Sequence, residues 1–217
     1  MHVICPSLRD CFLVLLCSAL FSSVAIAQQP LQRETKSGDA TPEEAIRSFF
    51  TAIADADPEA ACSLLVAPEK MREYCRIQSN LSTSFRSLAE AGEAAFGEEG
   101  RVFRAGIPAH GAMQRLAEVE AVVDGDTAVW PSNPRAPMKL QRINGGWRLD
   151  LYSSFQKPQQ LKMTNLIFER IANYVGEVAQ GIRAGDHQSV AAVQAELRRQ
   201  RQLMEEQLVP KLREASK

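Results

Sequence analysis

The stretch MKLQRINGGWRLDLY, residues 138–152, decides the fold expected for this chain. Two runs of alternating apolar and polar residues flank Asn144-Gly145, a dipeptide that favours the tight turn of a β-hairpin. In this register Leu140 lies opposite Leu149, so one face is apolar and the other is charged. The apolar face also carries Met138, Trp147 and Leu151. The pattern predicts a hairpin that closes a core with Trp147.

A second hairpin is predicted just before the first. The segments AEVEAVV, residues 117–123, and DTAVW, residues 126–130, stand on either side of Asp124-Gly125. Pro131 and Pro134 then mark the connection to the next hairpin. The two hairpins together predict a small antiparallel sheet.

Two capped helices are predicted ahead of the sheet. Thr41 suits the cap of a helix, Pro42 suits its first position, and Glu44 completes a capping box. In the same way Asp57 caps a short second helix that begins at Pro58. Behind the first cap, apolar side chains recur at helical spacing. They are Ala45, Ile46, Phe49, Phe50 and Ile53.

The stretch that follows is harder to assign. A third helix is predicted from Pro68, and residues 80–96 are expected to be helical but soft, because Gly92 weakens them. Residues 97–111 carry four glycines and a proline and receive no assignment.

The chain becomes helical again from Pro158. Two apolar stripes at helical spacing are separated by Ala184-Gly185-Asp186, which predicts two long helices joined by a short loop. We expect an antiparallel helical hairpin over residues 157–217. The alternative is two helices that splay and pack on separate surfaces, and the pattern leaves open whether they pack on the domain or project from it.

The first residues have the pattern of a secretory signal peptide. An apolar segment, residues 11–21, leads to Ala25-Ile26-Ala27, a small-residue cleavage site. The segment is about half as long as a membrane-spanning helix, so no stable span is expected after cleavage. Residues 28–40 are polar and read as a flexible linker. We therefore expect an exported protein, periplasmic or extracellular, cleaved after Ala27.

The charge balance argues against two classes of partner. Without residues 1–27, which contain one basic and one acidic residue, 24 basic and 25 acidic residues remain and the net charge stays at −1. Such a chain has no field to attract nucleic acid or an anionic membrane surface.

Two cysteines remain once the signal peptide is removed. Cys62 and Cys75 lie on neighbouring predicted helices, and in an oxidising compartment such a pair favours a disulfide. The alternative is two separate buried thiols. His110 and His187 lack a second ligand at helical spacing, so no metal site and no cofactor are predicted.

The order of these elements resembles the NTF2-like superfamily, also called the cystatin-like α+β cone. The resemblance lies in TPEEAIRSFFTAIADADPEAACSLL, residues 41–65, and in GGWRLDLY, residues 145–152, and it covers roughly residues 41–155. It implies an α+β domain, residues 41–156, in which helices pack on a curved, cone-like antiparallel sheet. In that superfamily the cone serves as an active site, a ligand pocket or a dimer surface, so the fold alone does not settle function.

A catalytic cone would need a general base in an apolar cavity and a donor for a developing oxyanion. The weak candidates are Asp150, His110 and Tyr152. Asp150 is equally explained by a solvent-facing cross-strand pair with Lys139, and His110 by a loop position. Tyr152 can serve as a plug between sheet and helix.

The aromatic side chains on the sheet have two interpretations. Trp130, Trp147 and Tyr152 are candidate ligand platforms, but large apolar fillers are the more ordinary explanation. The leading hypothesis is an exported, non-catalytic NTF2-like binding or scaffold module. It would act through a small apolar ligand in the cone, or through the C-terminal helices on a second copy or a protein partner. The alternatives are a cone enzyme of ketosteroid-isomerase-like or polyketide-cyclase-like type and a structural envelope protein.

Overall fold

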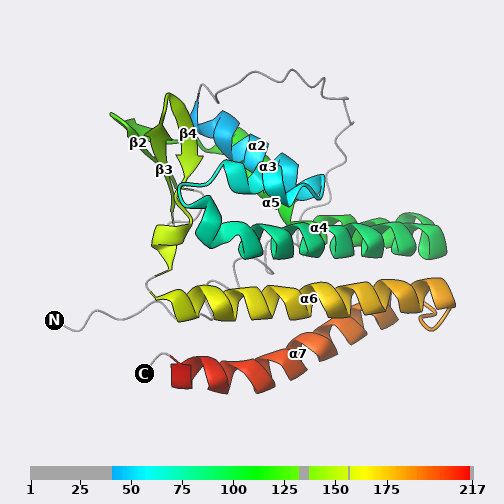
Figure 1. Ribbon diagram of the computed structural model, residues 1–217. Helices are drawn as coiled ribbons and strands as arrows, with labels where there is room; N and C mark the ends of the chain where they lie inside the picture. The colour runs from blue at the N-terminus through cyan, green and yellow to red at the C-terminus, as the bar shows by residue number, and fades with distance from the viewer. Residues whose placement is uncertain (1–40, 132–136, 156, 216–217) are drawn as a thin grey trace.

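The computed structural model describes residues 41–131, 137–155 and 157–215 (Figure 1). The predicted signal peptide and linker lie outside these residues. The fold is α+β, with six α-helices in the described residues and a four-stranded antiparallel sheet at one end of the molecule. The prediction of this fold class is confirmed.

The first two helices begin where their caps predict. Helix α2 (Pro42–Ala54) follows Thr41, whose Oγ1 accepts from Glu44 N at 3.2 Å while Thr41 N donates to Glu44 Oε2 at 3.1 Å. Helix α3 (Pro58–Ser63) follows Asp57, whose Oδ1 accepts from the amide of Ala60 at 3.0 Å. These reciprocal bonds satisfy amides that a helix start leaves without partners.

The stretch that was hard to assign is helical throughout. Helix α4 (Pro68–Phe96) is one continuous helix of 29 residues, so residues 80–96 are helical as predicted and continue the helix that begins at Pro68. Gly92 lies inside α4 as a packing position: the 3₁₀ helix η1 (Gly97–Gly106) folds back on it and brings Gly100 against its backbone. Helix α5 (Pro108–Glu118) then leads towards the sheet.

The sheet contains strands β1 (Val122–Asp124), β2 (Thr127–Trp130), β3 (Met138–Ile143) and β4 (Gly146–Leu149), paired in that order. In the second hairpin Leu140 pairs with Leu149, as predicted. Its turn residues Asn144 and Gly145 have φ angles of 53° and 82°, which suit the tight hairpin turn.

The first hairpin is shorter than predicted. Ala117 and Glu118 end helix α5 instead of starting a strand, and the turn falls at Gly125-Asp126, one residue later than expected. The reason is tertiary: α5 packs on α2 and places Leu116 in the core at 7 % exposure. This helical packing prevails over a short alternating pattern.

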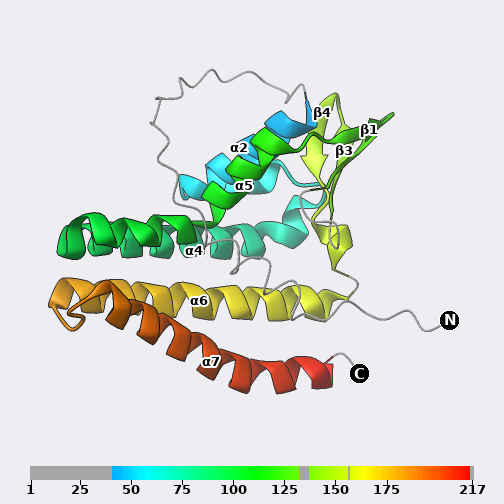
Figure 2. The ribbon, with the colours of Figure 1, turned by 180° about the vertical axis from the view of Figure 1, so that it is seen from behind.

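The C-terminal helices lie on the other side of α4. After η2 (Tyr152–Ser154), helix α6 (Pro158–Ala184) runs along α4 in the same direction (Figures 1 and 2). Gly185, with φ 83°, ends α6 in the left-handed region. Helix α7 (Val190–Ala215) contacts α6, and Arg170 donates to Gln207 Oε1 at 3.3 Å.

The buried apolar side chains form two clusters, which α4 joins. The sheet-side core contains residues of α2, α3, the start of α4, α5, the sheet and the start of α6, among them Ile46, Phe49, Met71, Trp130, Trp147 and Leu149. The helix-side core contains residues of the rest of α4, η1, α6 and α7, among them Leu88, Phe103, Ile171, Val175, Ile182 and Val193. No helix in the described part of the chain has the length and apolar character to span a membrane.

Candidate functional site

Asp150 is buried rather than solvent-facing. Its residue is 8 % exposed, its Oδ2 accepts from Gln141 Nε2 at 3.2 Å, and its Oδ1 accepts from the amide of Ser153 at 3.1 Å. The expectation of a solvent-facing side chain is therefore wrong, because the chain turns into η2 directly after the strand and covers it. The predicted alignment with Lys139 holds for the backbone, since Asp150 N donates to Lys139 O at 2.8 Å. The carboxylate anchors this turn.

The other two catalytic candidates lie on different elements. His110 belongs to helix α5 and not to a loop, and its side chain lies outside the described atoms. Tyr152 begins η2, partly buried, with Lys70 Nζ 4.6 Å from its ring centroid. Asp150 thus follows the end of β4, His110 belongs to α5 and Tyr152 belongs to η2.

Both tryptophans fill the sheet-side core. Trp130 is 2 % exposed and its indole N–H donates to the carbonyl of Val119 at 3.0 Å. Trp147 is 1 % exposed, and the guanidinium of Arg142 lies 4.7 Å from its ring centroid. Their burial favours the interpretation as core fillers over that as ligand platforms.

A shallow groove lies between α4 and α6. It has a volume of about 270 Å³, is partly open to solvent, and lies over the apolar side chains of Ile77 and Ala172. Its polar lining consists of Asn80, Thr83, Ser84, Glu169 and Asn173. We call this feature the α4–α6 groove.

Three polar side chains in the α4–α6 groove have free hydrogen-bonding capacity. Within the described residues, Asn80, Ser84 and Asn173 make no side-chain hydrogen bond. By contrast, Thr83 Oγ1 donates to the carbonyl of Ser79 at 3.0 Å, and Glu169 lies 3.7 Å from an Arg76 nitrogen. The groove therefore offers two carboxamides and a hydroxyl beside the carboxylate of Glu169.

Sequence reasoning missed this groove. The segment QSNLSTS, residues 78–84, interrupts the apolar stripe of α4 with polar residues. This interruption is the sequence feature that could have indicated a polar groove. The partners on α6 lie almost ninety residues further along the chain, and only the parallel packing of α4 and α6 brings them together.

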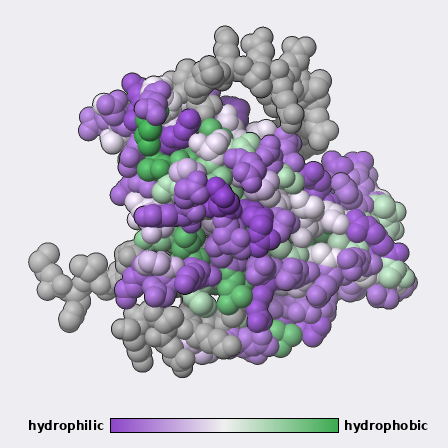
Figure 3. All heavy atoms as spheres, in the orientation of Figure 1, coloured by the Kyte–Doolittle hydropathy of each residue, from purple (hydrophilic) through white to green (hydrophobic). Residues whose placement is uncertain are grey.

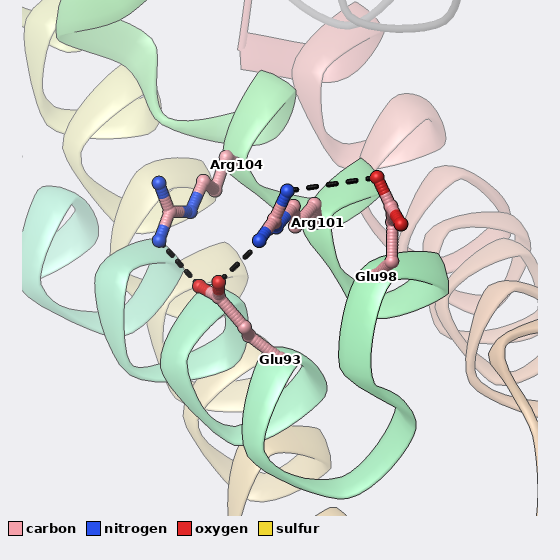
Figure 4. A network of polar contacts seen from close by, with 4 residues as sticks. All are labelled: Glu93, Glu98, Arg101 and Arg104. Atoms are coloured by element: carbon pink, nitrogen blue, oxygen red, sulfur yellow. Dashed lines mark hydrogen bonds and ion pairs between the residues drawn. The ribbon is translucent and has the colours of Figure 1, made fainter. Parts of the chain in front are cut away.

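A cluster of charges on η1 and the end of α4 is structural (Figure 4). Glu93 accepts from Arg104 and, at 3.3 Å, from Arg101, which also lies 3.6 Å from Glu98. The hydrogen bond from Arg104 is the main cause that lowers the pKa of Glu93. Two cations and two anions pair within the cluster, so it leaves no net charge for a ligand and instead attaches η1 to α4.

Metal chemistry and relatives give no further assignment. Among the described side chains, no group of three or more His, Cys, Asp or Glu residues is arranged to hold a metal ion. No known protein family, curated protein or solved structure matches the chain.

Proposed function

We propose that this protein is an exported, non-catalytic binding module with an NTF2-like domain, and that a small neutral polar ligand binds in the α4–α6 groove. The observation that carries the proposal is the set of unengaged side chains, Asn80, Ser84 and Asn173, around one hollow. Three of the seven lining residues belong to α6, one of the C-terminal helices from which a binding role was expected.

The lining defines the class of ligand. Carboxamides and hydroxyls both donate and accept, and they suit a ligand that carries hydroxyl and amide groups. The apolar floor of Ile77 and Ala172 leaves room for a methyl group. Arg76 donates to Glu73 and lies 3.7 Å from Glu169, so one cation faces two carboxylates and an anionic ligand is disfavoured. A volume of about 270 Å³ suits a ligand the size of an N-acetylated monosaccharide.

The NTF2-like assignment, with its cone-shaped sheet, belongs to the same proposal. It is supported by the capped α2, the short α3 and a β3–β4 hairpin whose Trp147 closes the core beside α2. We also propose that α6 and α7 act as an antiparallel hairpin, which the Arg170–Gln207 bond supports. In that arrangement α7 braces α6, and α6 forms one wall of the groove.

Self-association through α7 is less well supported than ligand binding. The exposed large apolar side chains are spread over several elements: Val102, Val122, Val123, Val129, Leu166 and Leu203. Leu203, on α7, is 38 % exposed, which is ordinary for a monomer surface. Figure 3 shows a face that is mainly hydrophilic, with hydrophobic atoms in small separate groups.

A cone enzyme is also less well supported. Both carboxylate oxygens of Asp150 accept hydrogen bonds that hold the β4–η2 turn. A base committed in this way would have to break structural bonds before it could take a proton.

The test is a titration of residues 28–217, labelled with ¹⁵N, with N-acetylglucosamine followed by amide chemical shifts. A shallow, half-open groove predicts binding in the millimolar range, a free energy of about −4 kcal/mol. The amides expected to shift are those of residues 77–84 on α4 and 169–173 on α6. Asn173→Ala is expected to abolish these shifts, because it removes one of the two free carboxamides.

The matched control is Gln180→Ala, which removes an exposed carboxamide from α6 outside the groove. It is expected to leave the titration unchanged. The proposal is overturned if no amide in the two segments moves, or if Asn173→Ala and Gln180→Ala titrate alike.

A further inference from the structure

The two cysteines lie in contact at the corner between α3 and α4. Cys62, in the last turn of α3, is 6 % exposed, and Cys75, in the second turn of α4, is fully buried. Both are free thiols in the structure, and their side chains lie close enough to interact, while Cys62 Sγ donates to the carbonyl of Pro68 at 3.0 Å. Two buried thiols that interact side by side are the arrangement from which a disulfide can form.

The chain between the two cysteines covers the open edge of the sheet. Leu149 N donates to Leu64 O at 2.9 Å, and Val66 N donates to Leu149 O at 3.0 Å. Leu65 between them is 3 % exposed and forms a parallel bridge with Leu149. Residues 64–66 thus take the place of a further strand beside β4 and satisfy groups that a free edge would expose.

The surroundings make the thiols unreactive once the protein has folded. Burial is the main cause that raises the pKa of both Cys62 and Cys75. The thiolate is the form that attacks a disulfide, so a buried thiol with a raised pKa exchanges slowly. A catalytic or redox-sensing pair needs the opposite: an accessible sulfur with a lowered pKa.

We propose that Cys62 and Cys75 are joined by a structural disulfide that forms during folding, is inert in the folded protein, and fixes residues 64–66 to the edge of β4. The two thiols give two electrons and two protons to a disulfide oxidant, which leaves as the dithiol. This inference does not depend on the α4–α6 groove.

The first measurement is the mass of residues 28–217, refolded in a glutathione redox buffer and then alkylated with iodoacetamide in urea. The expected product is two hydrogens lighter than the reduced chain and carries no alkyl group at Cys62 or Cys75. The folded product is then treated with dithiothreitol, without and with urea. The bond is expected to persist in the folded protein and to break in urea. Free thiols after refolding, or equal reduction rates in the two conditions, would overturn the proposal.

The second measurement tests the role of the bond at the sheet edge. Protein that is reduced in urea and refolded in dithiothreitol is expected to have a Tm about 5–10 °C below that of the oxidised protein, while Cys62→Ala/Cys75→Ala, which has no bond to lose, has the same Tm with and without this treatment. Hydrogen exchange at the amides of Val66 and Leu149 should rise on reduction more than at the amide of Leu140, inside the sheet. Equal changes at all three amides would contradict the fixing role.

Discussion

The sheet-side core and the helix-side core are packed in different ways. The sheet-side core contains two large side chains, Trp130 and Trp147. The buried polar groups on this side, the indole N–H of Trp130 and the carboxylate of Asp150, are hydrogen-bonded. The helix-side core has mostly small and aliphatic buried side chains besides Phe103, and it depends on close backbone approach where Gly100 meets Gly92. One core should therefore be sensitive to lost volume and the other to added volume.

The junction between the two cores has a weakness that neither core has alone. Ser79 and Ser82, in the middle of α4, are 3 % and 1 % exposed, and their hydroxyls have no partner within the described residues. A buried hydroxyl without a partner is destabilising. The same polar segment supplies the lining of the α4–α6 groove, so the stretch that stabilises α4 least is the stretch proposed to bind.

The largest effect is expected for Trp147→Ala in the sheet-side core. Removing a side chain that is 1 % exposed should lower the free energy of unfolding by about 3–5 kcal/mol, through lost burial and the cavity left behind. Urea unfolding followed by circular dichroism measures it. Val122→Ala, at 67 % exposure, is the control and should change stability by less than about 0.5 kcal/mol.

The same experiment tests whether the two cores are independent. Because α4 belongs to both, Trp130 fluorescence from the sheet side and circular dichroism from the helices should report one transition in Trp147→Ala. Two separate transitions would contradict this expectation, because the two cores would then unfold as independent units.

The next largest effect is expected for Gly100→Ala on the helix side. A Cβ at this position would lie 2.0 Å from the carbonyl oxygen of Gly92, so η1 and α4 must move apart, at a cost of about 1–3 kcal/mol. Gly111→Ala is the control, because a Cβ there meets only the flexible end of Arg115 at 3.9 Å, and alanine favours helix α5. Equal effects of the two substitutions in thermal unfolding would remove close approach as the explanation.

At the junction, Ser82→Ala should stabilise the protein. The substitution removes a buried hydroxyl without a partner, and we expect a gain of about 1 kcal/mol in the free energy of unfolding. Ser189→Ala should have the opposite sign, with a loss of about 1 kcal/mol, because Ser189 Oγ accepts from the amide of Ala192 at the start of α7. A loss of stability in Ser82→Ala would mean that this hydroxyl has a partner such as a buried water.

The same contrast explains what the sequence predicts and what it does not. The caps at Thr41 and Asp57 and the turn at Asn144-Gly145 depend on residues within a few positions of each other, and they are confirmed. The helical end of α5, where a strand was predicted, and η1, which received no assignment, depend on packing against distant segments. Caps and turns can be predicted from a single sequence, whereas the close packing of segments distant in the sequence cannot.

The candidate site follows the same rule. The burial of Trp147 follows from alternation along one hairpin. The burial of Asp150 does not, because it comes from the turn into η2 and the bond from Ser153. Asn173 could be placed opposite Asn80 only once the parallel packing of α4 and α6 was known.

The smallest expected effect concerns the surface of the helix-side region, where charge pairs replace buried contacts. Arg199 donates to Glu196 at 2.6 and 2.8 Å and Gln200 donates at 2.8 Å, and these bonds lower the pKa of Glu196 to about 2. Because the folded-state pKa is lowered, the stabilisation is complete above the unfolded-state value of 4.5 and is lost as the pH falls through about 2. Solvent screens the pair, since the Arg199 side chain is 60 % exposed, and its contribution to stability is small.

The measurement is the difference in the free energy of unfolding between the wild type and Glu196→Gln as the pH falls from 7 to 2. The difference should shrink below pH 4.5, because the wild-type carboxylate and the neutral glutamine become alike. Glu177→Gln, an exposed position on α6, separates the loss of this pair from the loss of any negative charge. If the two variants follow the same pH curve, the helix-side surface owes nothing specific to Glu196, and its stability must come from the contacts of Val193 and Met204 beneath it.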